Sequence, residues 1–264
     1  MTIGIIGIGN MGAAILNSII NSKICSLGDI YIYDKISQAT TPFENNGVNI
    51  CKTDAEAANT DYLILAVKPQ NMEETVVNIK NNLNRQTVII SIAAGINENL
   101  FANVLGYIPK LALVMPNTPL VLGEGATALS RAGNIEDDEF EFVKAIFSTR
   151  GTAVEIDKSQ MNEIIAINGS SPAFIYLFAK GFMQYAKSVE LDEQKTLELF
   201  CASLKGAAKM MTEYGKDIDS LINMVTSPGG TTLAGLKVLE NENFTDIIKK
   251  TCEATTQRAR ELNL

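Results

Sequence analysis

Short apolar runs alternate with longer helical segments over the first 150 residues of this 264-residue chain, and this alternation constrains the fold more than any other feature. The runs Tyr62–Val67 and Val88–Ile92 are continuously apolar, without the polar positions of a strand that has one wet face. Strands covered on both faces look like this, as in a parallel sheet between helices. The region therefore predicts a doubly wound α/β domain. The expected strands are Thr2–Ile6, Asp29–Tyr33, Tyr62–Val67, Thr87–Ile92, Leu111–Val114 and Thr152–Ile156, and the expected helices are Met11–Asn21, Met72–Asn82 and Asp137–Ser148.

The chain changes character from about Gln160, where β-rich runs disappear and helical periodicity takes over. Between Phe174 and Tyr185, apolar residues recur at spacings of three and four, which gives a helix an apolar stripe. Some of these faces are free to pair with another subunit, and on this ground we expect a homodimer. We expect a sheet-containing domain over residues 1–158 and an all-helical domain over residues 159–264. The expected helices of the second domain are Ile164–Ile167, Ala173–Ala186, Glu193–Tyr214, Asp217–Met224 and Phe244–Leu262.

Composition excludes several classes of function. The formal net charge of −8 argues against nucleic acid and anionic membranes as partners. No apolar run reaches membrane-spanning length, and the N-terminus lacks the basic region and cleavage site of a signal peptide, so we expect a cytoplasmic protein. The four cysteines form no CxxC pair, and the chain has no histidine. We therefore expect no metal site and a catalytic chemistry that works without imidazole.

A glycine motif follows the first expected strand and precedes the first expected helix. Gly7-Ile8-Gly9-Asn10-Met11-Gly12 fits the pattern G-x-G-x-x-G in the strand–turn–helix context of a dinucleotide site. Gly7 makes the tight turn, Gly9 lets the backbone approach a pyrophosphate, and Gly12 allows close packing of helix on strand. The motif predicts that these six residues bind a dinucleotide.

The second expected strand ends in Tyr33-Asp34-Lys35, which bears on the choice of cofactor. An acidic residue about 20 positions after the glycines accepts the ribose hydroxyl of NAD. Lys35 is instead suited to the 2′-phosphate of NADP. Both interpretations stay open, so the expected cofactor is NADPH or NADH.

Three further segments end strands of the expected sheet, at the edge where open α/β sheets bind ligands. Ala66-Val67-Lys68-Pro69 follows the central apolar run, and the small residues Ala93-Ala94-Gly95 are suited to a flat nicotinamide. We predict cofactor contacts for both segments. Asn117, between two prolines, offers an amide to the substrate, and the alternative is a rigid loop in which it caps a turn.

The segment Thr226-Ser227-Pro228-Gly229-Gly230-Thr231-Thr232 carries four hydroxyls and a glycine pair directly before a helical run. Its glycines permit positive φ, so that successive N–H groups can turn inward as an anion-binding nest at a helix N-terminus. Such a nest suits a small carboxylate. An ordinary helix-capping loop is the alternative.

Together these segments closely resemble the pyrroline-5-carboxylate reductase family, over nearly the whole chain. The last segment, which reads SPGGTT over residues 227–232, is the most specific match, whereas the glycine motif is shared by many families. The remaining matches are the motifs that begin at Gly7, Ala66, Ser91, Met115, Gly123 and Gly169.

The resemblance implies an N-terminal Rossmann domain, a helical dimerisation domain and often a ring of dimers. It implies reduction of 1-pyrroline-5-carboxylate to L-proline with NAD(P)H, the last step of proline biosynthesis. Ser227, Gly229, Gly230, Thr231 and Thr232 would line the substrate site, and the Thr232 hydroxyl would meet the ring nitrogen. A cyclic imine is already electrophilic, so this reaction accords with the absence of histidine.

Two residues depart from the family pattern. Ser171 stands where the family usually has a second glycine, which is expected to crowd the substrate cleft or to shift the start of a helix. Asp34 is not a feature of the NADPH-preferring members that carry a small or basic residue at this position.

Two other functions are compatible with parts of the sequence. A β-hydroxyacid-type dehydrogenase would use a helical lysine, for which Lys180 and Lys205 are the candidates, although neither has a supporting motif. A non-catalytic nucleotide-sensing module would bind the cofactor without turnover, and it leaves the hydroxyl-rich segment unexplained.

Overall fold

The computed structural model describes residues 1–149 and 151–262, which divide into two compact units. The first unit contains Met1–Pro172 together with the C-terminal stretch from Cys252, and the second contains Ala173–Thr251. The chain passes from one unit to the other inside α7 (Ser171–Ser188) and returns inside α11 (Phe244–Leu262). None of the helices in the described part of the chain combines the length and apolarity needed to cross a bilayer.

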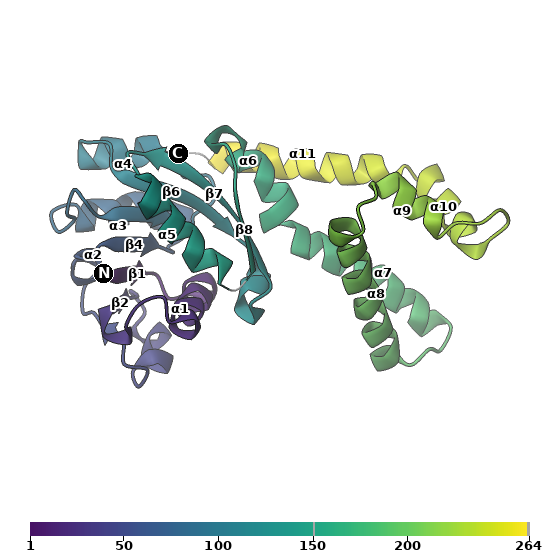
Figure 1. Ribbon diagram of the computed structural model, residues 1–264, viewed down its shortest axis with the longest axis horizontal. Helices are drawn as coiled ribbons and strands as arrows, with labels where there is room; N and C mark the ends of the chain where they lie inside the picture. Colours follow the sequence, from purple (N-terminus) through teal and green to yellow (C-terminus); the bar gives the residue numbers. More distant parts are fainter. Residues whose placement is uncertain (150, 263–264) are drawn as a thin grey trace. The chain divides into compact units, whose positions relative to one another are not determined.

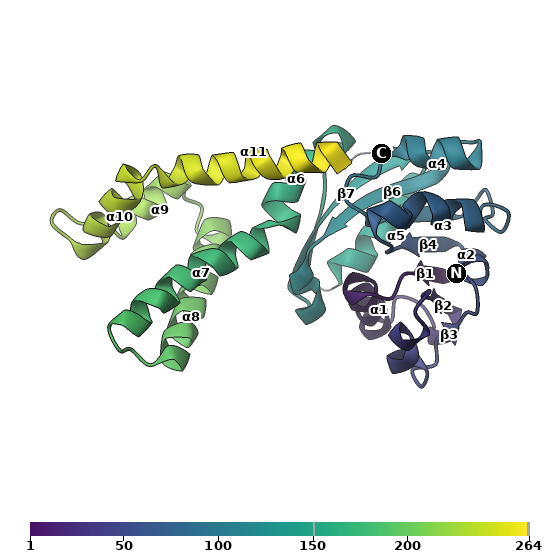
Figure 2. The same cartoon turned by 180° about the vertical axis from the view of Figure 1, so that it is seen from behind.

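One sheet organises the first unit (Figures 1 and 2). Eight strands of the described chain form it in the order β3-β2-β1-β4-β5-β6-β7-β8. Neighbours run parallel except β6 and β7, which are antiparallel. The strands are β1 (Ile3–Ile6), β2 (Ile30–Tyr33), β3 (Asn49–Ile50), β4 (Tyr62–Leu65), β5 (Val88–Ser91), β6 (Lys110–Pro116), β7 (Gly125–Gly133) and β8 (Gly151–Glu155).

The six strands expected from the sequence are all present, but the sequence did not indicate β3 or β7. Strand β3 has only two residues, and both are exposed. Strand β7 reads Gly-Ala-Thr-Ala-Leu-Ser-Arg-Ala-Gly, with few β-branched or aromatic residues. It is a strand because it pairs with β6 over seven residues and with β8 over five, so tertiary pairing overrides weak propensity.

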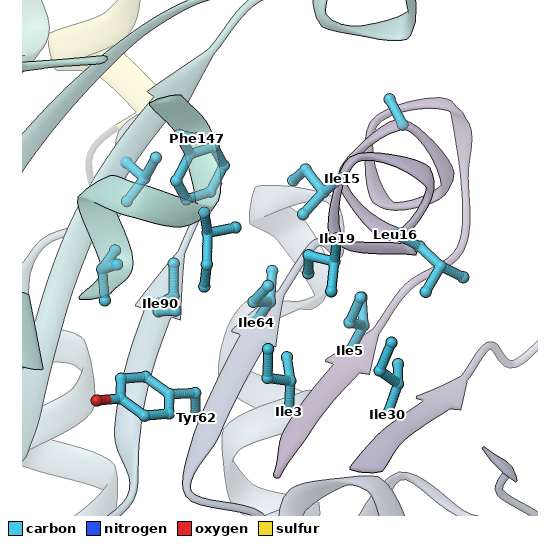
Figure 3. Close-up of a cluster of buried hydrophobic side chains, with 14 of the residues drawn as sticks. Ile3, Ile5, Ile15, Leu16, Ile19, Ile30, Tyr62, Ile64, Ile90 and Phe147 are labelled. Carbon is cyan, nitrogen blue, oxygen red and sulfur yellow. The ribbon is translucent and has the colours of Figure 1, made fainter. Parts of the chain in front are cut away.

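Helices cover both faces of the sheet, which accounts for the continuous apolar runs. On one face, Ile5 of β1 and Ile64 of β4 pack against helices α1 (Asn10–Ser22) and α5 (Asp137–Ser148), as Figure 3 shows. On the other face, Leu63 and Leu65 belong to a second cluster with α2 (Asp54–Ala58), α3 (Met72–Ile79) and α4 (Glu98–Leu105). The side chains of β4 thus alternate between two buried layers, and the predicted doubly wound fold is confirmed.

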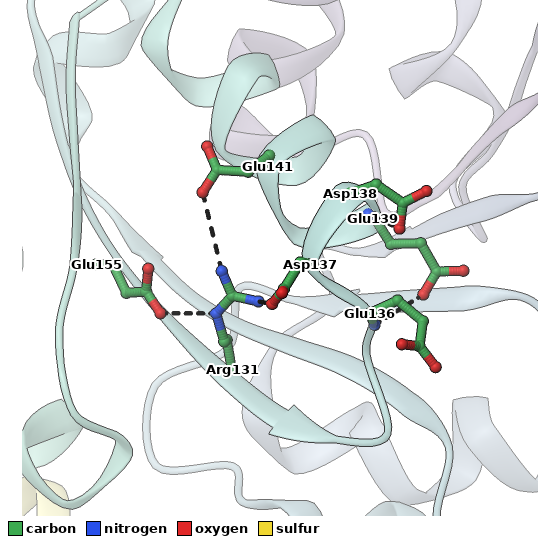
Figure 4. A network of polar contacts seen from close by, with 7 residues as sticks. All are labelled: Arg131, Glu136, Asp137, Asp138, Glu139, Glu141 and Glu155. Carbon is green, nitrogen blue, oxygen red and sulfur yellow. Dashed lines mark hydrogen bonds and ion pairs between the residues drawn. The ribbon is translucent and has the colours of Figure 1, made fainter.

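Polar contacts fix the antiparallel end of the sheet to α5. Arg131 of β7 donates through Nε to Glu155 at 2.8 Å and through one terminal nitrogen to Asp137 at 2.7 Å (Figure 4). Its guanidinium carbon lies 4.2 Å from the centroid of the Phe140 ring. Single exposed ion pairs contribute little, but a stacked guanidinium with several carboxylates holds a defined geometry. The network joins β7, β8 and α5.

Short helical pieces complete the first unit. Helix α6 (Met161–Ile164) runs into a π-helical segment, Ile165–Gly169, where the sequence predicted an α-helix over 164–167. Met115, Ala128, Ile165 and Ala259 form a small cluster that attaches the end of α11 to β6 and β7. The 3₁₀ helices are Leu27–Asp29, Ser37–Ala39, Thr41–Phe43, Pro69–Asn71, Thr118–Leu122 and Lys158–Gln160.

The second unit is all-helical, as predicted. Besides parts of α7 and α11 it contains α8 (Glu193–Glu213), α9 (Ile218–Met224) and α10 (Thr231–Asn241). The rings of Phe178, Phe182, Phe200 and Phe244 contact one another at centroid distances of 4.7–6.2 Å. Helices α8, α9 and α10 nevertheless have no buried residue, and large apolar side chains such as Leu177 and Leu199 are exposed. In the single chain this unit has little core of its own.

Candidate active site

The glycine motif forms the turn between β1 and α1. Gly7 has a φ of +97°, a region that favours glycine, and its N–H donates to the carbonyl oxygen of Tyr33 at 2.8 Å. A Cβ on Gly12 would lie 1.9 Å from the carbonyl oxygen of Gly7. Only glycine therefore lets α1 approach the loop this closely. A Cβ on Gly9 would meet no heavy atom within 4 Å, so Gly9 faces the open side of the turn.

The N-terminus of α1 has the features of a phosphate site. The helix begins at Asn10, with Gly9 as its N-cap, and in the described chain no side chain caps this end. The first turn also carries no acidic residue. Free N–H groups and the positive end of the helix dipole favour an anion here. The loop therefore fits the pyrophosphate of a dinucleotide.

A cavity of about 440 Å³ opens beside this loop, at the carboxyl ends of β1, β2 and β4. It brings together seven of the residues predicted to bind the cofactor, namely Gly7, Gly9, Asp34, Lys35, Ala66, Val67 and Lys68. Tyr33, Asp54, Asn71, Glu74 and Asn78 line it as well. The sequence carried no signal for Asp54 and Glu74, because only the fold brings the starts of α2 and α3 to this edge.

Eight other predicted cofactor residues do not line this cavity: Ile8, Asn10, Met11, Gly12, Pro69, Ala93, Ala94 and Gly95. Ile8 and Gly12 are buried in the turn itself, and Pro69 begins a 3₁₀ helix. Ala93 and Ala94 are partly buried against the apolar clusters, and Gly95 has a φ of +75°. Contacts of these eight residues with a cofactor stay a prediction.

Asp34 is held in the cavity wall by the backbone on both of its sides. Its Oδ2 accepts the N–H of Ile8 at 2.6 Å, and its Oδ1 accepts the N–H of Ile36 at 2.8 Å. The carboxylate is thereby tied both to the glycine loop and to its own turn. Lys35 beside it is exposed.

The pKa of Tyr33 reflects the negative charge of this wall. Burial raises the pKa of the Tyr33 phenol, and the charges of Asp54 and then Asp34 raise it further. Both carboxylates therefore place negative potential at the same point.

Asn117 links three segments rather than standing free. Its Oδ1 accepts the N–H of Ala126 at 2.9 Å, and its Nδ2 donates to the carbonyl oxygen of Asn168 at 3.3 Å. The side chain is buried at 8% exposure and bridges the end of β6, the start of β7 and the π-helical segment. Both partners lie within the first unit, and a contact of Asn117 with substrate stays a prediction.

Asn168 is a buried polar residue that the sequence analysis did not single out. Its Nδ2 donates to the carbonyl oxygen of Met115 at 2.6 Å, whereas its buried Oδ1 has no hydrogen-bond partner in the described chain. It lies in the π-helical segment, a feature that often marks functional sites. The available signal was a polar residue ending an apolar helical run.

The Ser227–Thr232 segment forms a tight turn at the start of α10, in the second unit. The N–H of Gly230 donates to the carbonyl oxygen of Ser227 at 2.9 Å, and Gly229 has a φ of +75°. With Pro228 second and Gly229 third, this is the arrangement of a type II turn. Gly230 is the N-cap of α10, and within the described residues no side chain caps the helix. Thr231 and Thr232 form its exposed first turn.

Comparison with known proteins decides the family. Residues 158–262 match the family model for pyrroline-5-carboxylate reductase dimerisation, and residues 2–95 match a model described as NADP oxidoreductase, coenzyme F420-dependent. Pyrroline-5-carboxylate reductase of Escherichia coli is 30% identical over 99% of this chain and 98% of its own length. The chain belongs to the pyrroline-5-carboxylate reductase family. The Arabidopsis thaliana reductase is likewise 30% identical, over 99% of this chain and 95% of its own.

Solved reductases have the same fold throughout. The Plasmodium falciparum pyrroline carboxylate reductase, solved with NADP bound, superposes with a TM-score of 0.91 at 28% identity and covers 100% of this chain and 98% of its own. The Coxiella burnetii pyrroline-5-carboxylate reductase gives 0.90 at 29%, with the same coverage. The predicted family, fold class and enzyme class, an oxidoreductase acting on a C=N bond, are confirmed. The dimerisation match supports homo-oligomerisation.

Ser171, which the sequence analysis expected to crowd the substrate cleft or to shift the start of a helix, contacts the segment before α7. The Ser171 hydroxyl donates to the carbonyl oxygen of Asn168 at 3.4 Å, and α7 begins at Ser171 itself. The side chain thus contacts the π-helical segment that precedes α7.

Proposed function

We propose that this protein reduces 1-pyrroline-5-carboxylate to L-proline with NADPH or NADH, as the last step of proline biosynthesis. The observation that carries the proposal is a pair of uncapped helix N-termini, α1 behind the glycine loop and α10 behind the Ser227–Gly230 turn. The first suits a pyrophosphate and the second suits a small carboxylate. When bound, the nicotinamide cofactor supplies the hydride that reduces the C=N bond.

The residues of the chain then have separate tasks. Gly7, Gly9 and the first turn of α1 hold the pyrophosphate, while Ala66, Val67 and Lys68 line the wall beside it. The backbone at Gly229 and Gly230, with the hydroxyls of Ser227 and Thr231, holds the substrate carboxylate. Thr232 directs its hydroxyl to the ring nitrogen, where it donates a hydrogen bond or relays the proton that the product amine requires. Because the imine is already electrophilic, positioning supplies much of the rate enhancement.

The assembly and location follow from the same assignment. The helical region over residues 159–264 forms the homodimer, and dimers associate further into a ring. The exposed apolar side chains of α7 and α8 support association, because such surfaces are rare on monomers. Residues 1–158 constitute the dinucleotide-binding domain, and the protein works in the cytoplasm.

Thr232 provides the test of this function. Thr232→Ala is expected to lower kcat for pyrroline-5-carboxylate reduction on the order of a hundredfold, because a positioned proton donor typically contributes this much or more. The dissociation constant for the dinucleotide should stay unchanged, since the glycine loop lies in the other unit. Thr232→Ser should restore most of the turnover. Thr231→Ala, which removes a hydroxyl assigned to the carboxylate, should instead raise KM and leave kcat closer to that of the wild type. Undiminished turnover in Thr232→Ala would remove the assigned role, and no imine reduction with either cofactor would remove the proposed function.

A further inference from the structure

The cavity beside the glycine loop is acidic on the side of β2. Three carboxylates line it, those of Asp34, Asp54 and Glu74, against two lysines, Lys35 and Lys68. In a dinucleotide fold, the residue at the end of the second strand meets the adenosine ribose, at the position where NADP carries a phosphate and NAD a hydroxyl. The charge of this wall therefore bears on which dinucleotide the protein accepts.

Asp34 has a fixed position in this wall. Its two oxygens accept the N–H groups of Ile8 and Ile36 at 2.6 and 2.8 Å, so rotation away from the cavity would break a charge-assisted hydrogen bond on each side. Each oxygen keeps a lone pair for a further donor. A ribose 2′-hydroxyl supplies such a donor. A 2′-phosphate carries close to two negative charges and only acceptor oxygens, so it meets like charge.

Lys35 is the group that opposes this effect, and its position is less constrained. Its side chain is exposed, whereas Asp34 is half-buried and bonded on both sides. Asp54 adds a second carboxylate near Tyr33, and its Oδ1 accepts the N–H of Ala55 at 2.9 Å. An exposed, solvated ammonium offsets fixed carboxylates only in part, because water and salt screen it more strongly.

We propose that Asp34 makes this reductase selective for NADH over NADPH. The proposal rests on the proposed function, because it assigns the dinucleotide to the cavity at the glycine loop. Asp34 accepts the ribose 2′-hydroxyl, and its fixed charge repels the 2′-phosphate.

Isothermal titration calorimetry with NAD⁺ and NADP⁺, on the full chain without substrate, tests this directly. The wild type is expected to bind NAD⁺ at least tenfold more tightly than NADP⁺ at low ionic strength. The preference should shrink between about 50 and 500 mM salt, because screening weakens the repulsion of the phosphate and leaves a ribose hydrogen bond largely unchanged. Adenosine 2′,5′-bisphosphate and AMP should show the same ranking as the two dinucleotides.

Variants separate the two charges. Asp34→Ser should abolish the preference for NAD⁺, and Asp34→Asn, which keeps the side-chain shape, should narrow it. Lys35→Ala should widen it. Glu74→Gln, at an exposed lining residue, is the matched control for loss of one negative charge and should change the ratio less than Asp34→Asn.

The outcomes distinguish this inference from the proposed function. Wild-type protein that binds NADP⁺ as tightly as NAD⁺ overturns the role of Asp34, as does an unchanged ratio in a folded Asp34→Ser variant. Either result leaves the proposed function standing as long as imine reduction proceeds with NADH or with NADPH. Binding of neither dinucleotide would overturn both.

Discussion

Two glycines of the same motif, Gly12 and Gly9, are expected to respond differently to an added methyl group: Gly12→Ala by losing stability and Gly9→Ala by losing dinucleotide affinity. In Gly12→Ala the new Cβ would lie 1.9 Å from the carbonyl oxygen of Gly7 and 3.3 Å from the Cβ of Ala66. Ordinary nonbonded contacts lie near 3.5 Å, so α1 would have to move on the order of 1.5 Å. That helix carries Ile15, Leu16 and Ile19, all fully buried, so its movement disrupts the core.

This geometry allows the loss of folding free energy in Gly12→Ala to be estimated. Overpacking a core typically costs about 1–3 kcal/mol, and here the obstacle is backbone with no flexible side chain to give way. We therefore expect Gly12→Ala to lose about 3 kcal/mol of folding free energy. In a domain of this size that corresponds to a melting temperature lower by about 6–12 °C.

Gly9→Ala is the matched control. Gly9 has a φ of −71°, which alanine adopts freely, and its added Cβ meets no atom within 4 Å. The free energy of unfolding of Gly9→Ala should stay within about 0.5 kcal/mol of the wild-type value. Alanine is a poorer N-cap than glycine, but it also lowers the conformational entropy of the unfolded chain, and the two effects offset each other. The methyl would nevertheless project where the cavity wall must approach a pyrophosphate, so dinucleotide affinity should fall. Thermal unfolding tests the stability of both variants, and calorimetric titration with NAD⁺ tests their dinucleotide affinity. Wild-type melting of Gly12→Ala, or undiminished binding by Gly9→Ala, would refute the reasoning.

Two further predictions concern the Ser227–Gly230 turn and an ion pair. Gly230→Ala would bring a Cβ within 2.6 Å of the Ser227 Oγ, so we expect a raised KM for the imine and an unchanged dinucleotide affinity. Gly235→Ala is the control, because a Cβ on Gly235 of α10 would meet no heavy atom within 4 Å. In initial-rate assays it should behave as the wild type. The Glu98 pKa is held below its ordinary 4.5, first by the hydrogen bond from Lys158. A depressed pKa stabilises the fold above the unfolded value and loses that effect as pH falls through the folded value. The melting-temperature gap between wild type and Glu98→Gln should therefore be full at pH 7 and close below about pH 4.5, and a constant gap down to pH 3 would contradict this assignment.

The features predicted from the sequence are those whose cause is local. Gly7 and Gly12 are glycines because a backbone angle and a helix contact require it, and that requirement is visible as spacing in the chain. The run Tyr62–Leu65 is continuously apolar because the strand is buried on both faces, and this too can be read from the sequence. Asp34 was found by its distance from the glycines, although its hydrogen bonds to Ile8 and Ile36 were not foreseen.

The features that were missed depend on contacts between distant segments. Strand β7 has weak propensity and exists through pairing with β6 and β8. The π-helical geometry at Asn168 accompanies its hydrogen bond to the Met115 carbonyl, 53 positions earlier in the chain. Asp54 and Glu74 reach the cavity only because α2 and α3 begin at the same sheet edge. Periodicity and motif spacing carry no record of such contacts.

The two groups of predicted site residues also differ in what can hold them in place. The glycine loop is fixed inside the first unit by backbone contacts and an apolar cluster, so its geometry is a property of one chain. The Ser227–Thr232 turn begins α10, whose residues, like those of α8 and α9, are not buried in the single chain. Exposed apolar helices of this kind gain their packing by association, and this region matches a dimerisation model. On the proposed function, we therefore expect the rigidity of the Thr232 hydroxyl to depend on oligomerisation, and the affinity for a dinucleotide not to depend on it.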